Sequence, residues 1–201
     1  LFTVDADNER DQHLPWYAPT RLFDVAQGMH HGWMLHGHRK SWNRPHSFFD
    51  NVERLVEIGR GSPTGVEIYR HRRFPKRYRD GVFSVCWTFG RIYFFPLEPH
   101  GATYKGEMEI FMQSTGHDGF APVDMAVGPS GDLFVAIGGR NTRGGVFRVR
   151  YTGTPCPEPI GGNALHQVLG ADQPLASWSR AHWVPKARPL GRKAFEQAVL
   201  D

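Results

Sequence analysis

The sequence is poor in cysteine and has no long apolar run. Its two cysteines, Cys86 in a predicted core strand and Cys156 in a proline-rich segment, are too few and too unlike in setting for a disulfide framework. No apolar stretch is long enough to span a membrane, and no Cys-x-x-Cys-His motif for covalent haem attachment is present. The given sequence contains no signal peptide, but Leu1 falls within a predicted strand, so we expect a piece of a longer protein and infer nothing about targeting.

What is present is typical of a globular β-rich protein. Hydrophobic residues make up 40% of the 201 positions, aromatic residues 13% and charged residues 22%. Within Ser62–Gln113, apolar alternation and turn residues predict one antiparallel unit of four short strands, which is the length of one β-propeller blade. Its strands are expected at Thr64–His71, Val82–Phe89, Arg91–Leu97 and Glu107–Gln113, with a turn over Glu98–Gly106.

The same pattern recurs on both sides of this unit. Downstream, three further strands are expected at Val123–Val127, Leu133–Ile137 and Val146–Tyr151, with Phe134 matching Phe83 and Phe147 matching Tyr93. Upstream, strands are expected at Leu1–Val4, Thr20–Ala26 and Leu55–Ile58. The sequence therefore predicts an all-β fold, an incomplete propeller of about two to three blades.

A helical tail is expected to follow the strands. We predict a partial propeller over residues 1–153, a proline- and glycine-rich linker over 154–162, and short helices over 163–201 that begin a following helical module. The helices are expected at Asn163–Leu169, Pro174–Trp183 and Gly191–Leu200, with Leu175 and Trp178 on one face and Trp178 and Trp183 packing on the propeller.

An acidic segment directly follows the first predicted strand. Asp5, Asp7, Asn8 and Asp11 supply carboxylate and amide oxygens that suit a hard cation such as Ca²⁺. The spacing is not that of an EF-hand, and an acidic turn stabilised by Asx hydrogen bonds is an equally simple interpretation. Both alternatives stay open on residue types alone.

Several separated motifs resemble the glucose/sorbosone dehydrogenase family. They are LFTVDADNERDQHLPWYAPTR (1–21), HGW (31–33), SPTGV (62–66), FPKRY (74–78), WTFGRIY (87–93) and GPSGDLFV (128–135). The nearest resemblance is to propeller modules of large exported bacterial proteins that also carry helical repeats and a c-type haem domain. It implies the C-terminal part of a six-bladed propeller in a periplasmic or secreted protein, with the haem domain as electron acceptor.

The resemblance also implies a cofactor chemistry. Members of the family use pyrroloquinoline quinone (PQQ) and Ca²⁺ to oxidise a sugar by hydride transfer to the quinone, assisted by a general-base histidine. Here the implied Ca²⁺ ligands, partly backbone carbonyls, fall on Asp5, Ala6 and Asp7, with Asn8 and Asp11 as nearby polar candidates. The general base belongs to an earlier blade, so the catalytic residue is not assigned in this sequence.

Two departures weaken the quinone site that the resemblance implies. Thr88 stands where quinone-binding members have a lysine near a hairpin turn, and Ala121 stands where they have arginines. Each lost charge-assisted hydrogen bond to the quinone costs about 1.5–3 kcal/mol. Arg91 and Arg140 are the remaining cationic candidates for holding the cofactor.

A long loop over residues 28–50 contains several histidines. Its length suits a lid over the mouth of a propeller, so His31, Trp33 and His36 are expected to face the substrate. The spacing of His36 and His38 is weak evidence for a transition metal, because alternate residues of an extended chain point to opposite sides. Solvated or stacking histidines are the favoured interpretation.

Two glycine-rich or basic segments have simpler interpretations than ligand binding. The run Arg70–Arg79 interleaves aromatics with arginines, but it matches a structural loop of the family, so no nucleic-acid partner is expected. Gly138–Gly145 joins two predicted strands and fits no phosphate-loop spacing, which favours a hairpin.

The expected function is a PQQ-dependent sugar dehydrogenase-like module, and the alternative is a catalytically silent propeller that binds carbohydrate or protein.

Overall fold

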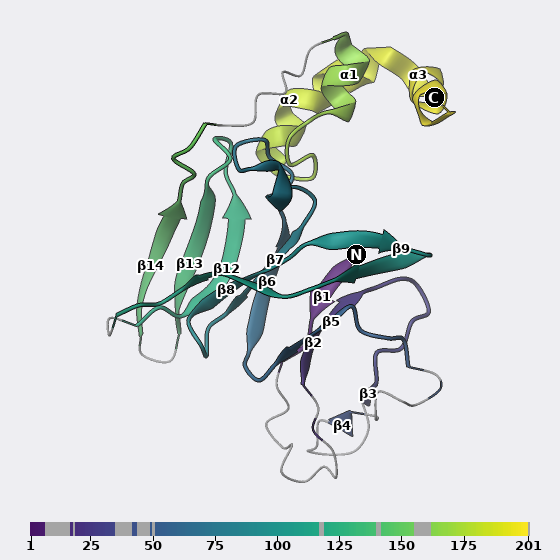
Figure 1. Cartoon of the computed structure of the whole chain (residues 1–201). Helices are drawn as coiled ribbons and strands as arrows, with labels where there is room; N and C mark the ends of the chain where they lie inside the picture. Colours follow the sequence, from purple (N-terminus) through teal and green to yellow (C-terminus); the bar gives the residue numbers. More distant parts are fainter. Residues whose placement is uncertain are drawn as a thin grey trace.

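A computed structural model describes residues 1–6, 17, 19–34, 42–43, 49, 51–116, 119–139, 142–154 and 162–200. These parts form small antiparallel sheets followed by a helical tail, as Figure 1 shows. The predicted all-β partial propeller with a short helical tail is therefore confirmed.

The central sheet is the complete four-stranded unit expected from the sequence. It contains β6 (Pro63–Ile68), β7 (Val82–Cys86), β8 (Arg91–Phe95) and β11 (Glu109–Gln113), in the order β11-β8-β7-β6. All five residues of β7 are buried because other sheets cover both faces. A strand that is buried on both faces has apolar residues at neighbouring positions, as at Val82–Phe83 and Val85–Cys86. The buried hydroxyl of Ser84 between them donates to the carbonyl of Thr64.

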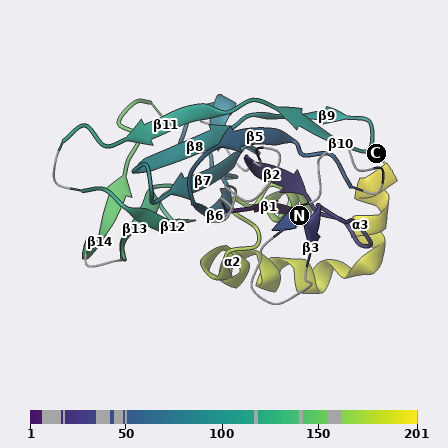
Figure 2. The ribbon, with the colours of Figure 1, turned by 90° about the horizontal axis from the view of Figure 1, so that it is seen from below.

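Two three-stranded sheets flank the central one. The first contains β1 (Phe2–Val4), β2 (Thr20–Asp24) and β5 (Val56–Gly59), and the second contains β12 (Pro122–Val127), β13 (Leu133–Gly139) and β14 (Thr142–Val149). Figure 2 shows the sheets fanned out, with β6 and β12 toward the middle of the fan and β11 and β14 on its outside. This is the arrangement of neighbouring propeller blades.

Gly65 allows the two innermost strands to approach closely. Its φ is +48°, and a Cβ at this position would lie 2.9 Å from the backbone Cα of Asp124 on β12. Only glycine adopts this conformation without strain and leaves room for the neighbouring strand. Gly65 thus sets the distance between the central sheet and the β12–β14 sheet.

Two small hairpins lie outside the blades. Leu97–His100 (β9) and Thr103–Gly106 (β10) pair where the sequence predicted only a turn, and Trp33–Met34 (β3) pairs with Trp42–Asn43 (β4) inside the predicted histidine loop. The β9–β10 strands are mostly exposed, so they lack the apolar pattern by which strands are recognised.

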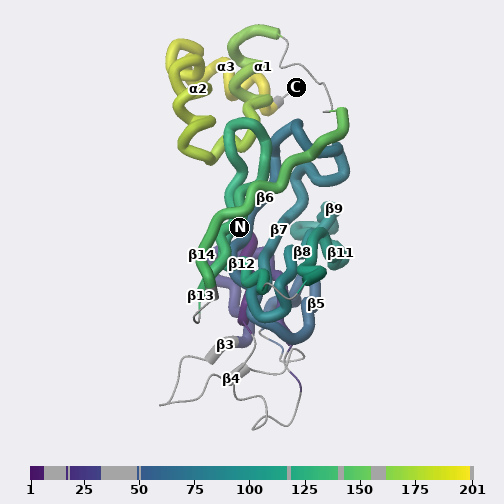
Figure 3. The backbone as a smooth tube through the Cα atoms, turned by 90° about the vertical axis from the view of Figure 1, so that its left-hand side faces the viewer, coloured from purple at the N-terminus to yellow at the C-terminus, as the bar shows by residue number. Residues whose placement is uncertain are grey.

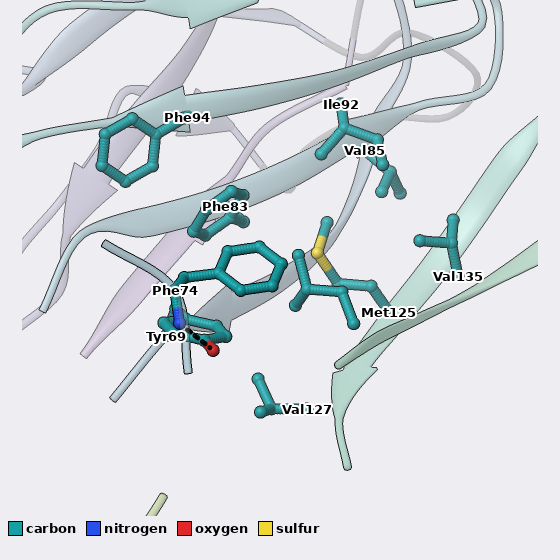
Figure 4. Packing of buried hydrophobic residues seen from close by; sticks show 10 residues of the cluster. Tyr69, Phe74, Phe83, Val85, Ile92, Phe94, Met125, Val127 and Val135 are labelled. Atoms are coloured by element: carbon teal, nitrogen blue, oxygen red, sulfur yellow. Dashed lines mark hydrogen bonds between the residues drawn. The ribbon is translucent and has the colours of Figure 1, made fainter. Parts of the chain in front are cut away.

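The largest core cluster fills the space between the central sheet and the β12–β14 sheet (Figure 4). Phe83 and Phe94 pack with ring centroids 4.8 Å apart, and Met125 of β12 belongs to the same cluster. A second cluster, which includes Leu22, Val82 and Phe95, lies between the central sheet and the β1–β5 sheet. Adjacent blades are therefore joined mainly by apolar burial.

Phe134 differs from its predicted counterpart Phe83. Phe83 is fully buried, whereas Phe134 is 36% exposed and Phe147 is 51% exposed. Phe83 faces the β12–β14 sheet, whereas Phe134 alternates with Leu133 and Val135, which face the central sheet, and so points to the other side. Among the described residues no further sheet covers that side.

Tyr69 joins this core to two turns. Its side chain is fully buried, and its hydroxyl donates to the carbonyl of Gly131 at 2.7 Å while accepting from the backbone N–H of Phe74 at 3.1 Å. Burial raises the pKa of Tyr69 well above its ordinary value, so the hydroxyl stays protonated and keeps its donor role.

The tail contains α1 (Ala164–Leu169), α2 (Ser177–Ala187) and α3 (Gly191–Leu200). Asn163 caps α1, since its side chain accepts a hydrogen bond from the N–H of His166, and Gly170 ends the helix as predicted. Leu175 precedes α2 and is 88% exposed, so its predicted place on an apolar helix face is wrong. None of the described helices is long and apolar enough to cross a membrane.

The tail docks on the loop between β6 and β7. Arg72 forms a forked ion pair with Asp172, and Gln173 accepts from the N–H of Arg70 while donating to the carbonyl of Ile68. Trp178 donates from Nε1 to the carbonyl of Val127, which confirms that this tryptophan packs on the sheets. Figure 3 shows the tail at one end of the sheets and β3 and β4 at the other.

The basic run in this loop is largely paired within the protein. Besides Arg72, Arg70 pairs with Asp80, Arg77 with Glu109, and Arg73 donates to the carbonyl of Tyr151. These contacts fit the structural interpretation of the run, because a polyanion would have to compete with existing partners.

Replacing Tyr69→Phe is expected to lower the free energy of unfolding by about 1–3 kcal/mol, because a buried N–H and a buried carbonyl lose their partner. Urea denaturation measures the change. Tyr104→Phe is the matched control, since Tyr104 is 38% exposed and sits on the β9–β10 hairpin. Equal stabilities of the two variants would contradict the role assigned to the Tyr69 hydroxyl.

Candidate functional site

The candidate site lies at the end of the sheets opposite the tail. The tail contacts the β6–β7 loop, so the antiparallel order puts the β7–β8 turn and the β5–β6 connection at the other end. We call this region the open rim and define it by Tyr17, Arg60, Gly61, Phe89 and Arg91.

Gly61 brings two turns of the open rim together. Its φ is +134°, and a Cβ here would lie 2.8 Å from Sγ of Cys86 and 3.1 Å from the ring of Phe89. A larger residue would push the β5–β6 connection away from the β7–β8 turn. Cys86 itself is buried with a free thiol, as the sequence predicted.

Two arginines of the open rim stack on aromatic rings. The guanidinium of Arg60 lies 5.3 Å from the ring centroid of Tyr17, and that of Arg91 lies 5.4 Å from the ring centroid of Phe89. Tyr17 is 49% exposed and Phe89 45% exposed. The rim therefore presents cationic groups on aromatic faces, an arrangement suited to planar anions.

Arg60 was missed by sequence reasoning. It stands in an ordinary strand connection, and its neighbour Tyr17 is distant along the chain, so no local spacing signals the pair. Arg91 was predicted as a cofactor contact, and its position at the start of β8 brings it to the rim.

Asp5 and Arg21 form a buried ion pair next to the β1–β2 connection. The guanidinium of Arg21 donates to Oδ2 of Asp5 from Nε at 2.9 Å and from Nη2 at 2.6 Å, and the backbone N–H of Arg21 donates to Oδ1. The side chains are only 6% and 7% exposed. Both carboxylate oxygens of Asp5 are thus used within the protein.

This pairing bears on the predicted calcium site. A carboxylate whose charge is compensated by a guanidinium, and whose oxygens both accept hydrogen bonds, is poorly suited as a side-chain ligand of Ca²⁺. The backbone carbonyls that the resemblance also implies as ligands are not affected by this pairing. Ala6 is exposed, and Asp7, Asn8 and Asp11 lie outside the described residues. In the part of the chain that the structure describes, no cluster of three metal-ligating side chains occurs.

His31 packs beside this ion pair. Its ring centroid lies 4.5 Å from that of Phe23, and Arg21 covers the same phenyl ring at 4.9 Å. Both imidazole nitrogens are shielded from solvent, and no described group hydrogen-bonds to either. Burial, and then the positive charge of Arg21, lower the pKa of His31, so the neutral ring can accept one hydrogen bond or proton.

The remaining predicted site residues are only partly located. His36 and Arg140 lie outside the described residues, and Trp33 is described only as part of β3. The structure brings together Asp5 and His31 through Arg21 and Phe23, whereas Arg91 lies on the neighbouring sheet with Phe89.

Comparison with known proteins identifies the type of fold. No protein-family profile matches the chain, and no curated protein matches it. Among solved structures, a match with a TM-score of 0.52 and 15% identity is a protein from Thermus thermophilus provisionally assigned as an oxidoreductase (glucose dehydrogenase). The aligned region covers 73% of this chain and 40% of that one.

The chain is therefore a partial β-propeller. Its fold is distantly similar to that of the Thermus thermophilus protein, and it spans less than half the length of that structure. At this identity the likeness establishes the architecture alone.

Replacing Asp5→Ala is expected to lower the free energy of unfolding by about 3–5 kcal/mol, because the buried charge of Arg21 loses its partner. Denaturant titration measures the change. In the control Glu98→Ala, an exposed pair with Lys105 is removed, and the expected loss is at most about 1 kcal/mol. Similar losses in both variants would show that the Asp5–Arg21 pair is not buried in solution.

The lowered pKa of His31 predicts a loss of stability in acid. Above about pH 6.5 the ring is neutral in both states, whereas below it the unfolded chain takes up a proton that the folded ring resists. The free energy of unfolding should therefore fall as the pH drops from about 6.5 towards the folded pKa. His31→Gln should flatten this dependence, with His71, whose pKa burial also lowers, keeping the rest. Parallel pH curves for the two proteins would contradict the assignment.

Proposed function

We propose that this chain is part of a sugar dehydrogenase-like propeller whose open rim holds an anionic quinone. The observation that carries the proposal is the pair of stacked arginines, Arg60 on Tyr17 and Arg91 on Phe89, at one end of a propeller of this type. The substrate would be a sugar, and a c-type haem domain of an exported parent protein would accept the electrons.

The donor set of the open rim suits PQQ. This cofactor is a planar tricarboxylate, and guanidinium groups bind carboxylates through charge-assisted hydrogen bonds while aromatic faces pack on flat rings. Arg60 and Arg91 would hold its carboxylates, which offsets the absence of cationic side chains at Thr88 and Ala121. When bound, the quinone supplies the hydride acceptor.

Calcium fits less well than the quinone. Asp5 is held by Arg21, so this carboxylate contributes to folding and not to a metal site. The role of the described residues is to bind and orient an anion at the rim.

A catalytically silent propeller is the second candidate. The compensated carboxylate of Asp5 favours it, because a metal that orients the quinone would lack this side-chain ligand. Such a propeller would bind carbohydrate or protein at the same rim.

Calorimetric titration of PQQ into the intact parent protein, with and without Ca²⁺, tests the proposal. PQQ is expected to bind, and Arg60→Gln and Arg91→Gln should each raise the Kd by about 10- to 100-fold, since each removes a charge-assisted contact. The control is Arg77→Gln, because Arg77 also stacks on a tyrosine, 5.0 Å from the ring centroid of Tyr78, but at the tail end of the sheets.

The outcomes separate the two candidates. Binding that depends on Arg60 and Arg91 but not on Arg77 supports a quinone site and calls for a sugar oxidation assay. No binding with or without Ca²⁺ contradicts the dehydrogenase proposal and leaves the silent propeller. An equal loss in all three variants would mean that the rim holds no specific site.

A further inference from the structure

The tail contains a cavity that is not part of the open rim. It lies between α1 and α2 and has a volume of about 400 Å³. This falls within the roughly 300–1,000 Å³ typical of small-molecule sites. Its walls include two tryptophans together with a few polar side chains, namely Gln167, Asp172, Trp178, His182, Trp183 and Lys186.

Both tryptophans are anchored by their indole N–H groups. Nε1 of Trp178 donates to the carbonyl of Val127 at 3.0 Å, and Nε1 of Trp183 donates to the carbonyl of Pro174 at 2.9 Å. Their polar atoms are thus already paired, and both side chains are only partly exposed. What the indoles present to the cavity is rigid aromatic surface.

Among the described residues around the cavity, the ammonium group of Lys186 has no carboxylate partner. Asp172 is compensated by Arg72, with Nη2 and Oδ2 2.6 Å apart. Lys186 donates to Oε1 of Gln167 at 2.9 Å, and among the described residues it forms no ion pair. An ammonium group has three donors, so two of those of Lys186 remain for a ligand.

We propose that this cavity binds a saccharide that carries a carboxylate, as in a uronic acid. The C–H face of a pyranose ring packs on an indole, Lys186 pairs with the carboxylate, and His182 offers a hydrogen bond to a ring hydroxyl. The amide of Gln167 holds Lys186 in place, since it accepts from Lys186 and donates to the carbonyl of Gly162. A neutral hexose would leave the charge of Lys186 unused. An aromatic acid would form no hydrogen bond with His182.

This site is separate from the proposed quinone site. It lies in the tail, which docks at the end of the sheets opposite Arg60 and Arg91, and it does not depend on the chemistry of the open rim. Binding here would link a sugar-containing polymer to the propeller without any redox step.

Titration of the intact parent protein with D-glucuronate, D-glucose and benzoate, followed by ligand-observed NMR, tests the proposal. Glucuronate is expected to bind at least tenfold more tightly than glucose or benzoate. Lys186→Gln should reduce that preference to within about twofold. The matched control is Lys193→Gln, an exposed lysine on α3 outside the cavity, which should leave all three affinities unchanged.

Trp183→Phe provides a second readout. It keeps an aromatic ring but loses surface and the hydrogen bond to Pro174, so the affinity for glucuronate should fall about tenfold. Circular dichroism would reveal whether this variant folds. If it does not, the loss of the preference for glucuronate in Lys186→Gln still tests the proposal. Equal binding of glucose and glucuronate, tighter binding of benzoate, absence of glucuronate binding, or an equal effect of Lys193→Gln would each overturn the proposal.

Discussion

The fold depends on the packing of one blade on the next. Tyr69 connects this packed core to the loop and the turn beside it. Its ring lies in the core between the central sheet and the β12–β14 sheet, and its hydroxyl joins the carbonyl of Gly131 to the N–H of Phe74. One side chain therefore fixes the β6–β7 loop to the β12–β13 turn. Because that loop is fixed, it also presents a defined surface to the tail.

The strands were largely predictable because blade strands are short, apolar and separated by turn residues. The predicted strand over Val82–Phe89 became β7, and the unit around it has the expected order. The β9–β10 hairpin was missed, since exposed strands carry no apolar pattern. Leu175 was misplaced because helical periodicity does not show where a helix starts. Phe134 repeats Phe83 in sequence, but burial depends on which sheet lies opposite.

The site was less predictable because its contacts join residues far apart in the sequence. Asp5 has the residue type of a calcium ligand, yet its partner is Arg21, and a single arginine sixteen positions away gives no local signal. Arg60 likewise meets the ring of Tyr17 only when the chain folds. His31 was predicted from its place in a loop, whereas its distinctive property, a ring with shielded nitrogens and a lowered pKa, comes from burial and from Arg21.

The contacts of Gln173 have an evolutionary consequence. Its amide accepts from the N–H of Arg70 and donates to the carbonyl of Ile68, and Trp178 likewise bonds to the carbonyl of Val127. Main-chain groups are the same whichever side chains they carry, so the propeller can change these positions without releasing the tail. These main-chain contacts therefore tolerate sequence drift at Ile68, Arg70 and Val127, whereas the ion pair with Asp172 requires the propeller to keep Arg72.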